Sequence, residues 1–241
     1  MNTIGTSRMH NRLRYVALIL ALVAVASSSA DSALRPSICY GTSSNGRLEH
    51  GRSLPISGPN FRAYSALGWT LGRTYVHDQV RAIMLDAYAA VLKTMPERVF
   101  VFGETGWASG GRFRPHKTHR NGSSVDLMVP VRRNGRSEPL PANATNRFGY
   151  DLEFDNDGRT GDYHIDFEAL GEHLYQLHRA AKARGIGIQR IIFEVPLQRL
   201  LFQSRRGSYL RQNMTFSKRP AWVRHDEHVH VDFAVRCRAD A

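Results

Sequence analysis

The chain has 241 residues, of which 42% are hydrophobic and 22% charged, so it can bury a core and is typical of neither a disordered nor a fibrous protein. The 33 lysines and arginines exceed the 21 aspartates and glutamates, and the net charge of +12 favours an anionic partner such as nucleic acid, a membrane surface or a wall polymer. Composition alone does not choose among these partners.

The first thirty residues have the pattern of a secretory signal peptide. Three arginines precede the uncharged run of residues 15–26, and a group of small residues ending at Ala30 offers a cleavage site. The run is shorter than the roughly 20 residues that cross a bilayer. We therefore expect cleavage after Ala30 and export to the periplasm, which argues against nucleic acid as the partner. An uncleaved N-terminal anchor is the alternative.

Cys39 and Cys237 are the two cysteines of the chain and lie near the two ends of the expected mature protein. In an oxidising compartment they can form a disulfide, and closing so long a loop is worth about 4–5 kcal/mol in the chain-entropy model. Two free thiols are the alternative. Two cysteines are too few for a zinc site made of thiolates.

The first half of the mature chain is predicted to contain one long helix. Residues 31–70 are rich in Gly, Ser, Pro and Asn and are expected to form loops and short turns. Residues 72–95 carry apolar side chains at helical spacing and predict an amphipathic helix that stops before Pro96. A buried strand, a Gly-rich basic loop and a second strand are expected to follow at residues 99–102, 103–122 and 125–129.

The second half is predicted to add a hairpin, a helix and two strands. Polar residues 131–148 have the profile of a surface excursion, and residues 149–166 predict a hairpin that turns at residues 155–158. Residues 166–184 predict a second amphipathic helix, which ends at Gly185. The remaining strands are expected at residues 188–195 and 228–235.

No linker or internal repeat interrupts residues 31–241. We therefore expect a single α+β domain with a small antiparallel sheet, flanked by the two amphipathic helices and by long loops. No transmembrane segment is expected after signal cleavage.

Five of the eleven histidines fall in two short clusters. The second cluster, residues 225–232, lies on an expected strand, where alternation places His228, His230 and Asp232 on one face. The valines between them take the apolar face. Two imidazoles on one rigid face can present a metal ligand beside a proton carrier.

The first cluster holds His116 and His119, and Asp126 lies on the strand that follows. Alternation directs Asp126 away from the apolar side of that strand. A His, an Asp and a His of the second cluster supply two neutral nitrogens and one carboxylate, which suits zinc with its fourth position open. Structural zinc normally has four protein ligands, so a three-ligand set points to catalysis. Two surface histidine patches are the alternative.

Together the two clusters resemble a known signature. The matching positions are His119-x-x-Gly122-x-x-x-Asp126 and His228-x-His230. This pattern resembles the lysostaphin, D-Ala-D-Ala peptidase and hedgehog-type zinc hydrolases, and within them most of all the penicillin-insensitive murein endopeptidases. That family also carries histidines at the positions of His116 and His225.

The resemblance spans roughly residues 46–233. Upstream, residues 54–59 resemble the family's Leu-Pro-x-x-Gly-Pro segment, and His77 matches a histidine that follows an arginine-rich stretch. Ser124 departs from the pattern, because the family has a second aspartate there. The family also has more cysteines. The departure at Ser124 puts in doubt a second carboxylate that would orient a metal ligand.

The resemblance implies one zinc ion held by His119, Asp126 and His230. It implies that His228 acts as general base and acid, taking a proton from water and passing it to the leaving amine. It also implies that His116 and His225 line the site and donate hydrogen bonds to a tetrahedral oxyanion.

Basic residues surround the first cluster, and three of them are candidates for substrate binding: Arg114, Lys117 and Arg120. Murein stem peptides carry free carboxylates, which a cationic rim can steer and orient. Solvated surface charges are the alternative.

We therefore expect an exported zinc metallopeptidase that hydrolyses peptide cross-links of peptidoglycan, of the D-Ala–diaminopimelate type. The alternatives are a D-Ala carboxypeptidase with the same metal set and a non-catalytic cationic wall-binding protein. The chain has no Gly-x-Ser-x-Gly motif and no thiol within either cluster, so a Ser or Cys nucleophile is a poor candidate. The oligomeric state does not follow from the sequence.

Overall fold

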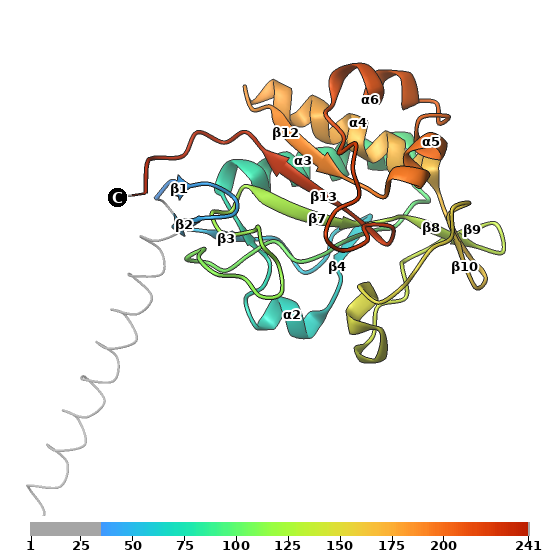
Figure 1. Cartoon of the computed structure of the whole chain (residues 1–241), viewed down its shortest axis with the longest axis horizontal. Coiled ribbons are helices and arrows are strands. Elements are labelled where there is room, and N and C mark those ends of the chain that lie inside the picture. Colours follow the sequence, from blue (N-terminus) through green and yellow to red (C-terminus); the bar gives the residue numbers. More distant parts are fainter. Residues whose placement is uncertain (1–34, 241) are drawn as a thin grey trace, which may run out of the picture. The chain divides into compact units, whose positions relative to one another are not determined.

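The core of the molecule is a five-stranded sheet, seen in a computed structural model that describes residues 35–240. Its strands, in spatial order, are β12 (Ile188–Ile192), β13 (His228–Phe233), β7 (Ser124–Met128), β6 (Phe100–Phe102) and β4 (Phe61–Ala63). β4 and β6 are parallel, and the other neighbouring pairs are antiparallel. The central pair, β13 and β7, joins segments about a hundred residues apart in the chain (Figure 1).

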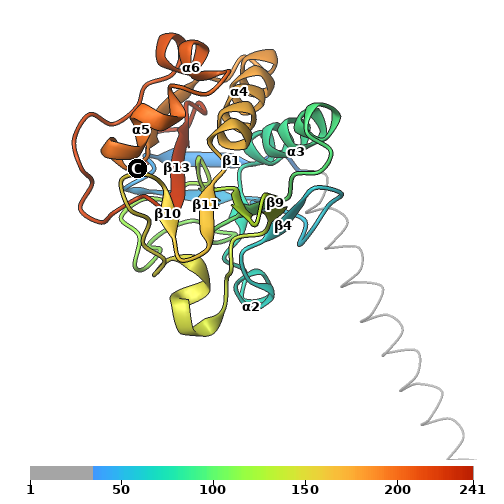
Figure 2. The ribbon, with the colours of Figure 1, turned by 90° about the vertical axis from the view of Figure 1, so that its right-hand side faces the viewer.

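Two helices, α3 (Asp78–Thr94) and α4 (Phe167–Ala183), lie side by side and cover one face of this sheet (Figures 1 and 2). The ring of His173 on α4 lies 4.8 Å from that of Tyr88 on α3 and 4.7 Å from that of Phe100 on β6, measured between centroids. The apolar residues of β7 and β13 join the same core. Because side chains alternate along a strand, the polar residues of β7 and β13 face away from the helices. The α+β prediction is confirmed.

The first predicted helix begins later than expected. α3 starts at Asp78, and within residues 72–77 lies the short strand β5 (Tyr75–Val76), which pairs with β3 (Arg52–Ser53). Val76 is fully buried in this strand. Its apolar side chain happens to match the helical spacing of the residues that follow, so the sequence included it in the helix. The imidazole of His77 caps α3, because its Nδ1 accepts a hydrogen bond from the backbone N–H of Gln79 at 3.3 Å.

Residues 35–70, predicted as loops and turns, also contain regular structure. The elements in this segment are β1 (Ile38–Gly41), β2 (Gly46–Glu49), β3, β4 and α2 (Ala66–Thr70). β1 and β2 form an antiparallel hairpin. These elements are two to five residues long, so their sequences carry little periodicity.

Residues 131–148, predicted as a surface excursion, contain regular structure. β8 (Val131–Arg133) and β9 (Arg136–Glu138) form a hairpin, and the 3-10 helix η1 (Ala144–Gly149) follows. The hairpin turns at Asn134 and Gly135, which have φ of 51° and 77°. Asn-Gly is the typical sequence of such a two-residue turn, so this signal was present and overlooked.

The next hairpin is shorter than predicted and turns at a different place. It consists of β10 (Arg159–Thr160) and β11 (Tyr163–Ile165), so its turn lies at residues 161–162. Residues 155–158 instead form a separate turn, closed by a 3.0 Å hydrogen bond from Gly158 N–H to the Asp155 carbonyl. β11 pairs with β8, which gives a second sheet of order β10-β11-β8-β9.

The predicted strand at residues 188–195 ends at Ile192, and two unpredicted helices follow: α5 (Val195–Leu201) and α6 (Gly207–Asn213). Val195 therefore begins a helix, in which a proline occupies the first turn. Each of these helices has only seven residues, too few for a clear apolar stripe.

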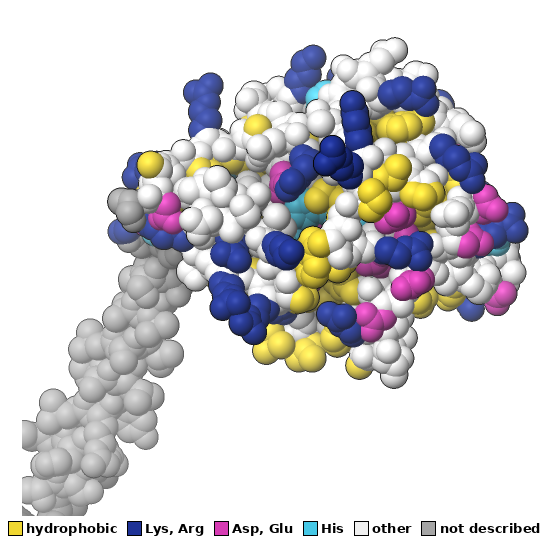
Figure 3. Space-filling view, viewed as in Figure 1, with side chains coloured by type: hydrophobic (Ala, Val, Ile, Leu, Met, Phe, Trp, Pro, Cys, Tyr) yellow, Lys and Arg dark blue, Asp and Glu magenta, His cyan; other side chains and the backbone are white. Residues whose placement is uncertain are grey.

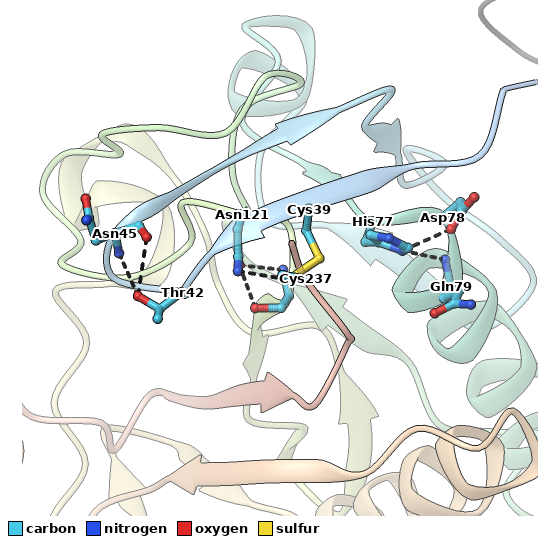
Figure 4. Close-up of a disulfide and its surroundings, with 9 residues drawn as sticks. Cys39, Thr42, Asn45, His77, Asp78, Gln79, Asn121 and Cys237 are labelled. Carbon is cyan, nitrogen blue, oxygen red and sulfur yellow. Dashed lines mark hydrogen bonds and ion pairs between the residues drawn. A yellow bond between two sulfur atoms is a disulfide. The ribbon is translucent and has the colours of Figure 1, made fainter. Parts of the chain in front are cut away.

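A disulfide joins Cys39 on β1 to Cys237 near the C-terminal end (Figure 4). Two backbone hydrogen bonds of 2.9 Å, between Gly41 and Arg238 and between Arg238 and Cys39, support the same contact. Asn121, in the loop before β7, donates from Nδ2 to Cys237 Sγ at 3.4 Å. The disulfide therefore packs against the segment that carries the first histidine cluster.

The predicted signal peptide, residues 1–30, lies outside the described residues. Residues from Ser37 onward form one compact unit. Within residues 35–240, no helix is both long enough and apolar enough to cross a membrane.

Candidate metal centre

The register of the central strands places His230 directly opposite Asp126. Both side chains are buried on the sheet face that points away from α3 and α4. His230 Nδ1 lies 3.0 Å from Asp126 Oδ1. The two residues are 104 positions apart in the chain, and the alternation predicted for each strand orients them toward each other.

His119 approaches the same oxygen from the loop before β7. Its Nε2 lies 3.1 Å from Asp126 Oδ1, and its Nδ1 donates to the carbonyl of Thr105 at 3.3 Å. The loop then turns at Gly122, where φ is +76° and a Cβ atom would lie 2.7 Å from the backbone nitrogen of His77. Only glycine fits there, because any side chain would meet both a strained conformation and that nitrogen.

The hydrogen bonds of the two histidines show that these contacts bring acceptors together. In the neutral ring, in which His230 Nε2 donates to Asp232 Oδ1 at 2.9 Å, Nδ1 directs a lone pair at Asp126, whereas in the protonated ring Nδ1 donates to Asp126. Likewise, His119 donates through Nδ1, and its buried Nε2 has no hydrogen-bond partner among the described residues. Three converging acceptors repel one another unless a proton or a cation lies between them.

The donor set fits a metal ion. The two separations from Asp126 Oδ1, 3.0 Å to His230 Nδ1 and 3.1 Å to His119 Nε2, are close to the ~3.3 Å between ligands that each lie ~2.0–2.1 Å from a tetrahedral zinc. A proton on His230 is the other way to hold this arrangement: burial lowers its pKa, but the hydrogen bonds to Asp126 and Asp232 raise it to about 9. The pKa of Asp126 stays well below its usual range, because the neighbouring histidines outweigh its burial.

His116 forms a second, overlapping triad with His119 and Asp126, in which one donor atom from each lies within 4.8 Å of the others. His116 Nδ1 is 3.8 Å from Asp126 Oδ2, a longer distance than the 3.0 Å between His230 and the other oxygen. Both triads share His119 and Asp126. His230 Nδ1 lies closer to Asp126 than His116 Nδ1 does, but among the described residues the group whose donor atoms all lie within 4.8 Å of one another contains His116 and not His230.

Glu104 orients His116, a role that the sequence analysis missed. His116 Nε2 lies 2.6 Å from Glu104 Oε2, and the same carboxylate accepts hydrogen bonds from Arg73 and from the Tyr64 hydroxyl. Burial raises the pKa of Glu104, but His116 and Arg73 lower it to about 2. The carboxylate is therefore ionised and holds the His116 ring in place.

Tyr150 orients Asp126 from the other side of the carboxylate. Its hydroxyl donates to Asp126 Oδ2 at 3.0 Å and accepts the backbone N–H of Glu104 at 2.8 Å. Tyr150 lies at the end of η1, and nothing in its local sequence indicates this contact. It depends on the tertiary packing of a residue that was predicted to begin a hairpin.

Asp232 is the acidic partner of His230. The serine at position 124 had put such a carboxylate in doubt. Asp232 Oδ1 accepts from both His230 Nε2 and the Ser124 hydroxyl, at 2.9 and 2.6 Å, and Oδ2 accepts from Arg190 Nε at 3.1 Å. A second aspartate at position 124 would set two negative charges side by side in this buried place. Ser124 therefore removes a repulsion, and His230 keeps an acidic partner.

His228 lies beside the centre with one nitrogen free to face it. Its Nδ1 donates to Glu227 Oε1 at 2.8 Å, and its Nε2 lies 3.8 Å from Asp126 Oδ2. The His225 ring is 4.6 Å from that of His228, and its Nδ1 donates to the Val223 carbonyl at 2.9 Å.

Burial lowers the pKa of His225 to about 4, so the ring is neutral at neutral pH and its other nitrogen is an acceptor. The donation to an oxyanion that the resemblance implies for His225 stays a prediction.

A cleft of about 790 Å³ opens beside the centre. Four residues that surround the centre form part of its wall: Glu104, His116, Tyr150 and Glu227. The rest comes mainly from η1, the residues after it, and residues 222–226. Figure 3 shows recessed histidine side chains, with lysine and arginine side chains around them on one side and acidic side chains on the other.

None of the three predicted substrate-binding residues belongs to the described wall of this cleft. Lys117 comes nearest, because its Nζ lies 4.5 Å from the centroid of the Trp222 ring, which does line the cleft. Arg114 is exposed, and the backbone of Arg120 bonds to that of Ser43 in the β1–β2 hairpin.

Buried imidazoles and carboxylates that adjoin an open cleft are typical of the active site of an enzyme. The sequence model of the penicillin-insensitive murein endopeptidases matches residues 39–241, so the chain belongs to this family. The predicted resemblance is thereby confirmed, and the chain is a peptidoglycan hydrolase. No curated protein matches it in sequence.

Proposed function

We propose that the protein is an exported zinc peptidase that hydrolyses D-Ala–diaminopimelate cross-links of peptidoglycan in the periplasm. Residues 31–241 are its single catalytic domain, and residues 1–30 are its signal peptide. The observation that carries the proposal is the convergence of His119 Nε2 and His230 Nδ1 on Asp126 Oδ1.

His119, Asp126 and His230 would hold one zinc ion. Zinc at this place supplies a Lewis acid that activates water and polarises the scissile carbonyl. Each ligand is fixed by a neighbour: Thr105 holds His119, Tyr150 holds Asp126, and Asp232 holds His230. Such outer contacts set the tautomer and the direction of each ligand atom.

His228 Nε2 would take the proton of the attacking water and return it to the leaving amine. The hydrogen bond to Glu227 supports this role, because it fixes the proton of the neutral ring on Nδ1 and leaves Nε2 as the base. The rings of Tyr150 and His228 lie 5.2 Å apart, so Tyr150 also limits how far this imidazole can turn.

His116 would adjoin the developing oxyanion, because it lines the cleft and its Nδ1 faces the centre. Of the three cations around the first cluster, Lys117 is the best placed to meet a substrate, at the rim beside Trp222. Arg114 and Arg120 would act only on parts of the polymer outside the cleft.

Digestion of purified dimeric muropeptides tests the proposal and separates it from a D-Ala carboxypeptidase. We expect conversion of dimers to monomers, loss of this activity with EDTA, and its return with zinc. Added β-lactam should leave the rate unchanged, since no serine is acylated in this mechanism. Trimming of terminal D-Ala with intact dimers would instead favour the carboxypeptidase, and full inhibition by β-lactam would refute the metal chemistry. Binding to sacculi without any cleavage would favour the non-catalytic wall-binding protein.

A further inference from the structure

The cleft beside the metal centre is acidic although the chain as a whole is basic. Two arginines line it, Arg147 and Arg224, against five carboxylates: Glu104, Asp151, Glu153, Asp226 and Glu227. A surplus of negative charge in a concave site attracts cations and repels anions. By formal count the lining of the cleft carries such a surplus, although ion pairs within the protein offset most of it.

Four of the five carboxylates have cationic or imidazole partners, and the fifth, Asp226, also lies 3.2 Å from Arg224 Nη2 through one of its oxygens. Glu104 bonds to Arg73 and His116, and Glu227 bonds to His228. At the exposed rim, Asp151 pairs with Arg147 and Glu153 with Arg224, at 3.2 and 3.1 Å. Their ionic groups are thus neutralised within the protein.

Asp226 differs from the other four, because one of its two carboxylate oxygens accepts no hydrogen bond from the described residues. Its side chain is 1% exposed, and Oδ2 accepts from the backbone N–H of Phe154 and lies 3.2 Å from Arg224 Nη2. Oδ1 is buried and has no hydrogen-bond partner among the described residues. A buried carboxylate oxygen without a donor is costly, so a donor from outside the chain would stabilise it.

We propose that Asp226 binds a primary ammonium group of the substrate and so determines which cross-linked peptides the enzyme accepts; this inference rests on the proposed function. In a diaminopimelate cross-link, one stem peptide uses its side-chain amine in the scissile bond. The other stem keeps its amine free and positively charged. That second amine shares its carbon with a carboxylate, and its ammonium is the group that Asp226 would receive.

The other walls of the cleft suit the aliphatic part of such a side chain. Phe148, Leu152, Trp222 and Val223 line it, and Trp222 is 59% exposed. An ammonium on a methylene chain would place its charge at Asp226 and its carbons against these apolar groups. Burial also raises the pKa of Asp226 to about 6, and a bound cation would favour its ionised form.

Acetylation of the free amine tests this inference. Treating a diaminopimelate dimer with acetic anhydride turns the ammonium into a neutral amide and leaves the scissile bond unchanged. For the wild type we expect kcat/KM to fall about 10–100-fold on the acetylated dimer, as loss of a charge-assisted hydrogen bond does. The fall should lie mainly in KM, since the contact is distant from the reacting atoms.

The Asp226→Asn variant completes the comparison. It keeps an oxygen for the Phe154 N–H but loses the charge, so it should cleave the free and acetylated dimers at rates equal within about twofold. Asp151→Asn is the matched control, because it removes one carboxylate from the same cleft whose charge is already paired. This control should still prefer the free amine.

Equal cleavage of both dimers by the wild type would overturn the inference while leaving the proposed function intact. A retained preference in a folded Asp226→Asn variant would overturn it as well. If the wild type cleaves neither dimer, the proposed function itself fails. The comparison of the two dimers with the wild type decides the matter even if the variant does not fold.

Discussion

Replacing His230 with alanine should remove the zinc and the hydrolysis of cross-links together. His230 contributes one of three converging acceptor atoms, and a mononuclear site with two protein ligands binds zinc weakly. We expect zinc content to drop from about one ion per chain to a trace, and activity to fall at least about 10⁴-fold. Metal analysis of the dialysed protein and the dimer assay measure the two losses.

The His116→Ala variant makes this prediction specific, because His116 belongs to the competing triad. If His230 is the third ligand, His116→Ala keeps its zinc and loses only part of its activity. The reverse result, with zinc retained by His230→Ala and lost by His116→Ala, would exchange the roles of the two residues. His164→Ala is a suitable control, because this histidine is exposed on β11, outside the centre.

Replacing His228 with alanine should leave the zinc in place and reduce kcat about 10²–10⁴-fold, the range found when a general acid–base group is lost. The reason is geometric: Nε2 faces the centre at 3.8 Å from Asp126, whereas Nδ1 is held by Glu227. Zinc content, circular dichroism and kcat on the dimer are the measurements. Zinc-loaded, folded protein with wild-type kcat would remove His228 from the mechanism.

The sequence was sufficient to predict the two strands that carry Asp126, His228 and His230, because the signals for these strands are local. Alternation over residues 125–129 and 228–235 places Asp126, His228 and His230 on the polar faces, and the structure pairs those faces. Gly122, a position of the matching pattern, lies where the backbone turns with φ of 76°. What alternation cannot give is the register between two distant strands, which places His230 opposite Asp126.

The groups that orient the site could not be predicted in the same way. Glu104 and Tyr150 act through contacts across the fold, and each looked like an ordinary strand or loop residue. Asp232 differs, because it lies two residues from His230 on the same strand and on the face that alternation predicts for it. The charge of the residues that line the cleft could not be predicted from the sequence either. Arg114 and Arg120 are close to the histidines in the chain, yet the cleft is lined by acids from the segments after η1 and before β13.

The central claim is that His119, Asp126 and His230 share one zinc ion, and anomalous diffraction at the zinc absorption edge tests it most directly. For crystals of the wild-type protein we predict a single strong peak, about 2.0–2.2 Å from His119 Nε2, Asp126 Oδ1 and His230 Nδ1. A peak bound to other residues, or zinc-loaded crystals with no peak at these three atoms, would contradict the account.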